Sequence, residues 1–172
     1  MFINFWYVAA QSGDIKFGVD KPFKTMMLGH NFALWRDTKG KVHCISDTCT
    51  HRGGALADGR IRGDCVECPY HGWTFNGAGD CVRIPSLGPD ARIPGRPRVD
   101  AYPVEERYGL VFVCLGGLPA AERPPILDIP EVGQEGWRTI VLQCDWQIDY
   151  KRSVENTMDP AHNEFTHPTH GF

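Results

Sequence analysis

The stretch that decides the fold is a pair of short motifs, Cys49-Thr50-His51-Arg52-Gly53-Gly54 and Cys68-Pro69-Tyr70-His71-Gly72-Trp73. Each motif carries one Cys and one His, in the pattern C-x-H followed by C-x-x-H. Glycines crowd both motifs, and a residue without a Cβ lets backbone N–H groups approach an inorganic core closely. We therefore expect two loops that clamp a metal centre from two sides.

Two kinds of metal centre fit two Cys and two His. A structural zinc ion takes a tetrahedral Cys2His2 set, usually with like ligands paired in sequence as C-x2–4-C and H-x3–5-H. A Rieske-type [2Fe–2S] cluster instead takes two Cys on one iron and two His on the other. Each motif here mixes Cys with His, so each loop would supply one ligand to each iron, which favours the cluster. A non-catalytic zinc or scaffold module stays open as an alternative.

The two motifs resemble the ligand loops of Rieske non-haem iron oxygenases, as do 75–85, Tyr102-Pro103-Val104 and Gly109-Leu110-Val111. The resemblance covers most of residues 4–117. It implies a mainly β Rieske [2Fe–2S] domain of antiparallel sheets over 1–117, with a cluster bound by Cys49, His51, Cys68 and His71. High-potential Rieske proteins join one further Cys from each loop in a disulfide. The corresponding positions here look like Gly54 and Tyr70, so the resemblance implies a low-potential cluster.

Composition excludes several other classes of protein. The 172 residues contain 18 Lys and Arg against 21 Asp and Glu, a net charge of −3, whereas a nucleic-acid-binding surface needs a basic surplus. The apolar runs 1–13 and 109–121 are too short to span a bilayer, and the first lacks the basic start of a secretory signal. We expect a soluble, cytoplasmic protein with no nucleic-acid or membrane partner. The cysteines outside the two loops are expected to be buried free thiols: Cys44, Cys65, Cys81, Cys114 and Cys144.

Short apolar segments between turn signals predict an all-β first domain. The expected strands are 2–9, 26–36, 41–46, 64–67, 73–75, 80–84, 102–106 and 110–115. Asp37-Thr38-Lys39-Gly40 is typical of a hairpin turn, and so is Asn76-Gly77-Ala78-Gly79.

Four prolines between residues 118 and 136 predict a stiff linker. Beyond it we expect a strand over 137–144 and a helix over 145–158. Residues 137–172 are fewer than the ~50 of even a small domain, so they are interpreted as the opening of a truncated domain. The alternative is a tail that packs back on the β domain.

A second group of polar residues lies between Asn156 and His167. Asn156, Asp159 and His162 are spaced by three and would lie side by side on a helix. His162 and His167 are five apart and would not share a helix face, so pairing them requires a break or a π-bulge. Pro160 supplies one cause of a break, or Asp159 caps a new helix. Spacing alone favours a polar helix end over a metal site.

The pattern N-x-x-D-x-x-H-x4-H also resembles the start of the α+β helix-grip catalytic domain of Rieske oxygenases. The resemblance implies that His162 and His167 bind a mononuclear Fe(II). It implies that Asp159 is the electron-transfer bridge, hydrogen-bonded to a cluster His of a neighbouring chain, and that Asn156 supports the iron ligands. The family's third ligand is a downstream Asp or Glu, which Glu155 and Glu164 do not match in position. His170 is a looser candidate.

The functional hypothesis is therefore an oxygenase component. Its cluster would take electrons from a reductase or ferredoxin and relay them to an iron that activates O2. The reaction would be hydroxylation or oxidative demethylation of a small organic, often aromatic, substrate, within a homo-oligomer that is a trimer or a multiple of it. The alternative is a stand-alone Rieske ferredoxin-like carrier, which the missing third ligand favours for this chain alone. Arg52, Arg60 and Arg62 are either a basic rim for an acidic donor or ordinary solvated surface.

Overall fold

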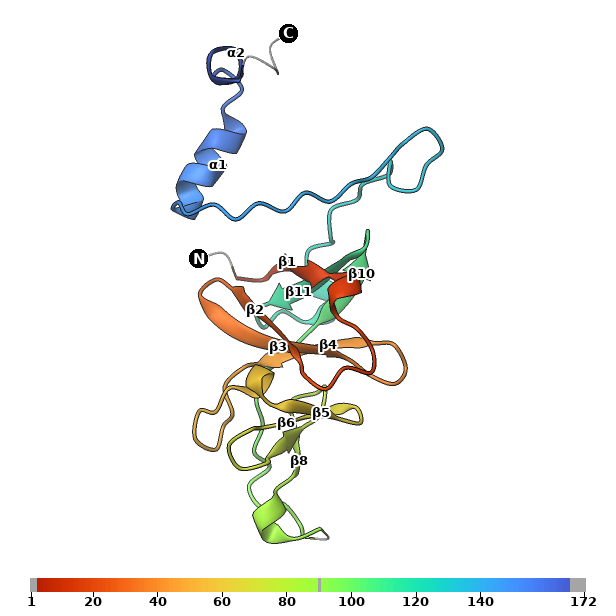
Figure 1. Cartoon of the computed structure of the whole chain (residues 1–172), viewed down its shortest axis with the longest axis vertical. Helices are drawn as coiled ribbons and strands as arrows, with labels where there is room; N and C mark the ends of the chain where they lie inside the picture. The colour runs from red at the N-terminus through yellow and green to blue at the C-terminus, as the bar shows by residue number, and fades with distance from the viewer. Residues whose placement is uncertain (1–2, 90, 168–172) are drawn as a thin grey trace. The chain divides into compact units, whose positions relative to one another are not determined.

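The computed structural model describes residues 3–89 and 91–167, and the chain divides into two compact units, Met1–Ile129 and Pro130–Phe172 (Figure 1). The strands of the first unit are β1 Phe5–Gln11, β2 Phe23–Met27, β3 His30–Arg36, β4 Val42–Ser46, β5 Arg60–Arg62, β6 Cys65–Glu67, β7 Thr74–Phe75, β8 Cys81–Arg83, β9 Ala101–Tyr102, β10 Val104–Arg107 and β11 Leu110–Leu115. Short 3-10 turns lie at η1 Ser12–Asp14, η2 Leu56–Asp58, η3 Pro85–Leu87 and η4 Ala120–Glu122.

The described strands form three sheets, in the orders β1-β11-β10, β2-β3-β4-β9 and β5-β6-β7-β8, and all the pairings are antiparallel. The predicted mainly β, antiparallel fold is confirmed. The first strand of the unit pairs with the last, since Phe5 lies opposite Leu115. Figure 1 shows β5, β6 and β8 on the far side of β3 and β4 from β1 and β11.

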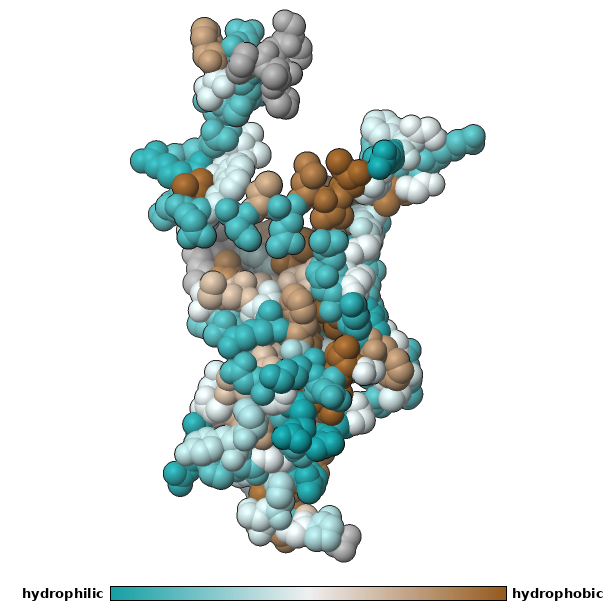
Figure 2. Space-filling model, viewed as in Figure 1, coloured by the Kyte–Doolittle hydropathy of each residue, from teal (hydrophilic) through white to brown (hydrophobic). Residues whose placement is uncertain are grey.

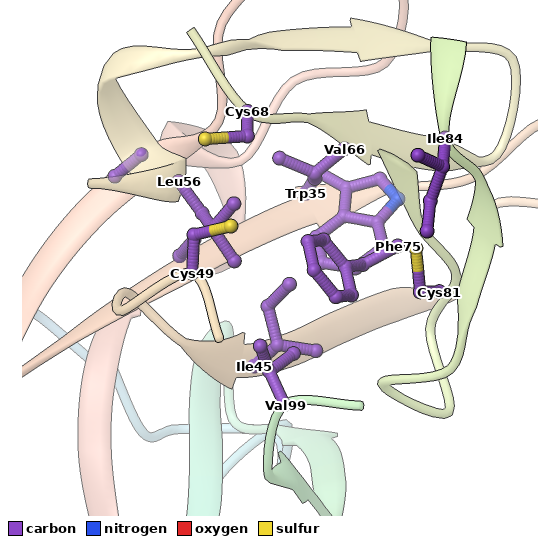
Figure 3. Close-up of a cluster of buried hydrophobic side chains, with 12 residues drawn as sticks. Trp35, Ile45, Cys49, Leu56, Val66, Cys68, Phe75, Cys81, Ile84 and Val99 are labelled. Carbon is purple, nitrogen blue, oxygen red and sulfur yellow. The ribbon is translucent and has the colours of Figure 1, made fainter. Parts of the chain in front are cut away.

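β3 is buried on both faces and divides two hydrophobic cores. Ala33 and Trp35 face one core, while Phe32 and Leu34 face the other, as the two-residue period of a strand requires. The first core also contains Val66 and Phe75 of the β5–β8 sheet, and it contains Cys49 and Cys68. In Figure 3 these two thiols lie at one edge of that core, on the opposite side from Cys81. β3 carries none of the predicted ligands, but its Ala33 and Trp35 help to form the core that contains both cysteines.

The strand predicted over 26–36 is wrong, because a tight turn interrupts it. Leu28 and Gly29 have φ angles of 50° and 79°, and Met27 pairs with His30 across them. Two consecutive residues with positive φ make the hairpin turn that matches the twist of its strands. Gly29 is the usual residue at the second position of such a turn, but Leu rarely adopts positive φ, so Leu28-Gly29 is a weaker turn signal than Asn-Gly or Asp-Gly.

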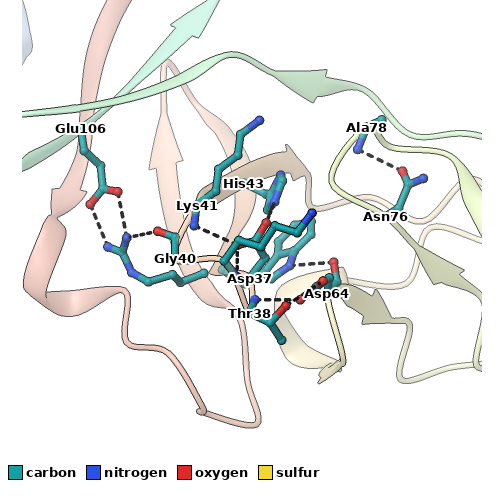
Figure 4. A network of polar contacts seen from close by, with 12 residues as sticks. Asp37, Thr38, Gly40, Lys41, His43, Asp64, Asn76, Ala78 and Glu106 are labelled. Atoms are coloured by element: carbon teal, nitrogen blue, oxygen red, sulfur yellow. Dashed lines mark hydrogen bonds and ion pairs between the residues drawn. The ribbon is translucent and has the colours of Figure 1, made fainter.

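Asp37 organises the turn between β3 and β4, which confirms the predicted hairpin (Figure 4). Its Oδ1 accepts hydrogen bonds from the backbone N–H groups of Lys39 and Lys41, both at 2.9 Å, and its Oδ2 lies 2.8 Å from His43 Nε2. The hydrogen bond with His43 is the largest cause of a pKa of Asp37 below its usual range, and the two backbone N–H donors add to it.

Residues 124–128, which fall in the predicted linker, belong to the first unit and contact two of its strands, β1 and β10. Trp6 Nε1 donates to the carbonyl of Pro124 at 2.8 Å, and Arg107 donates to the carbonyl of Ile126 and to the Asp128 carboxylate. Ile126 is 7% exposed. This part of the proline-rich segment is anchored to the β1-β11-β10 sheet.

The second unit contains α1 Tyr150–Met158 and α2 Asn163–Thr166. The strand predicted over 137–144 is wrong: these residues have no regular structure, and none of the described sheets includes them. Their apolar side chains are exposed, with Leu142 at 81%. The predicted helix begins at Tyr150 rather than at 145, because Asp149 caps it by accepting from Lys151 N–H at 2.9 Å.

The five cysteines outside the two loops form no disulfide, as expected, but not all of the predicted burial holds. Cys44, Cys81 and Cys114 are buried, Cys65 is half-buried, and Cys144 is exposed because it lies in the irregular segment before α1. Within residues 3–89 and 91–167, no helix has the length and apolar character needed to cross a membrane.

We predict that Asp37→Asn destabilises the first unit in a pH-dependent way. A carboxylate whose pKa is lowered by folding stabilises the fold above its unfolded pKa of about 3.9 and loses that effect as the pH falls below it. Losing the charged acceptor should cost about 1.5–3 kcal/mol at pH 7 and less near pH 3, because the loss runs from the unfolded pKa down through the lower folded pKa. Urea unfolding followed by circular dichroism measures this, with the exposed Asp14→Asn as the control. An equal cost at both pH values would contradict the prediction.

Candidate metal centre

The two motifs form loops with the same backbone geometry. In the first loop the N–H of Cys49 donates to the carbonyl of Gly54 at 2.9 Å, and the N–H of Gly53 donates to the carbonyl of Cys49 at 2.8 Å. In the second loop the N–H of Cys68 donates to Trp73 at 2.8 Å, and Gly72 donates to Cys68 at 3.1 Å. Gly53 and Gly72 have φ angles of 73° and 70°, a region that L side chains rarely adopt. Each loop therefore requires glycine four residues after its cysteine.

The loops bring all four predicted cluster residues together, with the sulfurs inside and the imidazoles outside. Cys49 and Cys68 are 2% and 3% exposed, whereas His51 and His71 are exposed, with ring centroids 4.6 Å apart. The pKa of Cys49 is raised to about 11. Burial is the main cause, and the neighbouring Cys68 thiol also contributes. Hydrogen bonds from the backbone N–H groups of His51 and Arg52 act in the opposite direction, because they favour a thiolate.

Aromatic contacts hold the two imidazoles. The His51 ring stacks on Trp73, with centroids 4.5 Å apart and an interplanar angle of 1°. His71 packs against Tyr70 at 3.9 Å. Desolvation by the neighbouring groups is the main cause that lowers the pKa of the exposed His51 ring, followed by the charges of His71 and Arg52. Trp73 is a site residue that the ligand pattern did not predict, although an aromatic residue directly after the glycine of the second loop is visible in the sequence.

The space between the loops suits an inorganic core held by close backbone. A Cβ on Gly54 would lie 3.1 Å from Cys68 Sγ and 3.4 Å from Tyr70 Cβ. The second distance is close to the Cβ separation of a disulfide, so positions 54 and 70 do face each other across the loops. With Gly and Tyr there, no disulfide links the loops of this chain.

The donor set consists of a buried pair of sulfurs and an exposed pair of imidazoles. Among the described residues, no three His, Cys, Asp or Glu side chains are placed to hold one metal ion. Two Cys on one side and two His on the other match the ligands of a cluster in which each iron takes one pair. The residues present therefore fit a [2Fe–2S] cluster.

The second group of candidates surrounds a break between the two helices. Asp159 ends α1, and its Oδ1 accepts a hydrogen bond from Ala161 N–H at 2.9 Å, so the predicted break beside Pro160 is confirmed. His162 and His167 flank α2, and their ring centroids lie 5.4 Å apart. The break thus pairs two histidines that a continuous helix would separate.

These histidines line a hollow of about 570 Å³ together with Asn156 and Asp159. Within the described part of the chain, His162 Nδ1 is the buried side-chain nitrogen that lacks a hydrogen-bond partner. It lies 3.6 Å from Asp159 Oδ2, too far for a hydrogen bond. A buried imidazole nitrogen left unpaired is suited to a metal ion. Glu155 pairs with Arg152 at 2.8 Å and does not line the hollow, and neither does Glu164; His170 lies outside the described residues.

A family model described as "Rieske [2Fe-2S] domain" matches residues 5–103. The chain is 38% identical over 170 residues to the toluene-4-sulfonate monooxygenase system iron-sulfur subunit TsaM1 of Comamonas testosteroni, covering 98% of this chain and 48% of that protein. It is also 38% identical to chlorophyllide a oxygenase of Chlamydomonas reinhardtii, covering 95% of this chain and 24% of that protein.

Solved structures give the same result. NdmB of Pseudomonas putida CBB5 superposes with a TM-score of 0.83 at 28% identity, covering 96% of this chain and 50% of that chain. Dicamba monooxygenase bound to dicamba superposes with a TM-score of 0.80 at 31% identity, covering 96% and 48%. The chain spans about half the length of these proteins or less.

We predict that Gly54→Ala weakens the metal centre. A methyl group 3.1 Å from Cys68 Sγ forces the loops apart by a few tenths of an ångström, and overpacking of this kind costs about 1–3 kcal/mol. The measurement is the rate of iron loss to a chelator, which should rise. Gly117→Ala is the matched control, because no atom lies within 4 Å of its added Cβ. Equal rates in the two variants would show that the close approach of Gly54 to Cys68 does not help to hold the metal centre.

Proposed function

The chain belongs to the Rieske [2Fe–2S] domain family, and on this premise we propose that it is the electron-carrying part of a Rieske non-haem iron oxygenase component. The observation that carries the proposal is the occurrence of two sites in one chain. The mixed Cys and His loops suit the cluster, and the hollow between α1 and α2 suits a second metal. A stand-alone Rieske ferredoxin would have no use for the hollow.

We assign Cys49 and Cys68 to one iron of the cluster and His51 and His71 to the other. When bound, the cluster supplies one-electron transfer at a potential set by its ligands and hydrogen bonds. The buried cysteines exclude water from the sulfur side, and the exposed imidazoles bring the opposite side to the surface, where a donor can approach. The absence of a disulfide between positions 54 and 70 supports the low-potential type.

At the second site we assign His162 and His167 as ligands of a mononuclear iron. Two His and one carboxylate form the usual site for a non-haem Fe(II) that reacts with O2. Asp159 would be the bridge that carries an electron from a cluster His of a neighbouring chain, and Asn156 would support the ligands. Both line the same hollow as the histidines, which supports these roles. The third, carboxylate ligand would be a residue other than Asp159, which is the one carboxylate among the described residues that line the hollow.

The names of the relatives indicate the substrate class. They include toluene-4-sulfonate monooxygenase, 3-chlorobenzoate-3,4-dioxygenase and dicamba monooxygenase. We propose hydroxylation or oxidative demethylation of a small organic, often aromatic, substrate with O2, with electrons from a reductase or ferredoxin, in a homo-oligomer that is a trimer or a multiple of it. A cytoplasmic location stays a prediction, and some relatives carry the word chloroplastic in their names.

We predict that His71→Cys retains iron but lowers the midpoint potential. A thiolate adds negative charge to the oxidised cluster, which moves the potential toward the value of about −400 mV of all-cysteine clusters. Redox titration and the visible spectrum measure the change. Tyr70→Phe, a neutral change next to His71, is the control. An unchanged potential and spectrum would remove His71 from the ligands.

The proposal as a whole is tested by counting iron and acid-labile sulfide on anaerobically purified chain supplied with Fe(II). We expect two sulfides and three irons per chain. His162→Ala should lower iron to two and leave sulfide unchanged, while Glu164→Gln, on the same short helix but outside the hollow, should change neither. Two irons in the unmodified chain would favour the stand-alone carrier, and zinc without sulfide would overturn the proposal.

A further inference from the structure

A buried carboxylate lies at the base of the first metal loop. Asp47 directly follows β4, stands two residues before Cys49, and is 3% exposed. In Figure 2 the surface over the part that Figure 1 labels β5 and β6, the strands that follow this loop in the sequence, is largely hydrophilic. Burying a carboxylate costs free energy unless hydrogen bonds and an opposite charge compensate it. The contacts of Asp47 therefore indicate what its burial achieves.

The backbone of the first loop is a short ladder whose outer end carries the two predicted ligands. Thr48 forms an antiparallel bridge with Ala55 in the middle of this ladder. At its base the N–H of Leu56 donates to the backbone carbonyl of Asp47 at 2.8 Å. The side chain adds a further bond, since Asp47 Oδ1 accepts from the buried N–H of Ala57 at 2.6 Å. Asp47 thus closes the base of the loop with both its backbone and its carboxylate.

The turn η2, which these bonds hold, also contacts the entry of the second metal loop. Its Leu56 is fully buried, and in Figure 3 it lies at the same edge of the first core as Cys68. Directly after η2, a Cβ on Gly59 would overlap the carbonyl oxygen of Glu67 and lie 3.1 Å from Pro69 Cδ. Glu67 and Pro69 flank Cys68 in the sequence. A displacement of η2 would therefore move one loop against the other.

Lys24 compensates the buried carboxylate from a neighbouring strand. It lies opposite Ala33 in the pairing of β2 with β3, so its side chain projects from the face that supports the first core. Its Nζ lies 3.5 Å from Asp47 Oδ2 and 4.0 Å from Asp58 Oδ2, and its side chain is 45% exposed. The two oxygens of Asp47 therefore have separate partners. Oδ1 holds the backbone of the loop, and Oδ2 faces a lysine that solvent reaches.

We propose that Asp47 is a positioning residue for the metal centre, which fixes the first loop at its base and holds η2 against the entry of the second loop. This inference rests on the proposed function, because the loops must hold a cluster for the residue to act on it. Each iron takes one ligand from each loop, so the distance between the loops sets the geometry of both irons. Groups that orient metal ligands affect metal affinity without touching the metal. The role requires the acceptor oxygen Oδ1 rather than the negative charge.

The test compares Asp47→Ala, which removes the acceptor and the charge, with Asp47→Asn, which keeps an acceptor oxygen and removes the charge. Asp58→Asn is the control for charge, because it removes a carboxylate that is 64% exposed and directly follows Ala57. Asp37→Ala is the control for stability, because it removes a buried carboxylate that accepts two backbone hydrogen bonds in the turn between β3 and β4.

Three quantities are measured on the full chain with its cluster, under conditions in which far-ultraviolet circular dichroism shows each variant to be folded. They are the rate of iron loss to a chelator, the visible absorbance and circular dichroism of the cluster, and hydrogen exchange of residues 55–58. The cluster spectrum reports the geometry around the irons, which a general loss of stability in a folded chain does not change.

We expect Asp47→Ala to lose iron about tenfold faster than the unmodified chain, as is typical when a group that orients metal ligands is removed. Its cluster spectrum should shift, and residues 55–58 should exchange faster, because the N–H of Ala57 loses its acceptor. Asp47→Asn should stay within about threefold of the unmodified chain, because an amide oxygen still accepts from Ala57. Asp58→Asn and Asp37→Ala should leave both the rate and the spectrum unchanged.

Iron loss from Asp47→Ala no faster than from Asp37→Ala would overturn the positioning role while leaving the proposed function intact. Equally fast iron loss from Asp47→Asn and Asp47→Ala would also overturn it, because the charge rather than the acceptor would then matter. If Asp47→Ala does not fold, the folded Asp47→Asn decides alone, and rapid iron loss from it overturns the role. An unmodified chain that assembles no iron and sulfide would instead overturn the proposed function.

Discussion

The structure depends on one constraint: two loops from separate parts of the chain must present their cysteines to the same small volume. Each loop meets it with a pair of backbone hydrogen bonds onto its own cysteine. The loops are then held against each other from beneath by a core that contains both cysteines, Trp35 and Phe75. Above the core, His51 of the first loop stacks on Trp73 of the second. Neither loop completes the site alone, so the centre and the core that supports it are parts of one packing arrangement.

The same constraint explains which features could be predicted from the sequence. The residue types and spacing of Cys49, His51, Cys68 and His71 are determined by ligand chemistry, and the chemistry is visible in the sequence. The glycines of the loops are visible for the same reason, because only glycine tolerates the required φ. The exact facing of positions 54 and 70 needed the structure, although the family resemblance pointed to the pair. The role of Trp73 depends on a contact between two loops, and no single segment carries it.

The two strands that were wrongly predicted depend on pairing between strands, which their own residues do not determine. The turn at Leu28 is formed by a residue with no turn preference, and pairing of β2 with β3 holds it in place. Residues 137–144 have the apolar composition of a strand, but a strand also requires hydrogen bonds to a partner strand, and none of the described sheets includes these residues. The break between α1 and α2 could be predicted from Pro160 and from the five-residue spacing of the histidines. The unpaired Nδ1 of His162 could not, because burial is a property of the folded segment.

The pairing of β1 with β11 affects the order in which the sheets of the first unit fold. Phe5 meets Leu115, so this sheet joins segments at opposite ends of the unit, while β5 to β8 pair only with strands close to them in sequence. Contacts between near neighbours form faster than contacts that close a long stretch of chain. During synthesis on a ribosome, the hairpins around the second loop can form before β11, the partner of β1, has been synthesised. β1 then completes the unit last, and until that moment its unpaired edge and apolar side chains are open to aggregation.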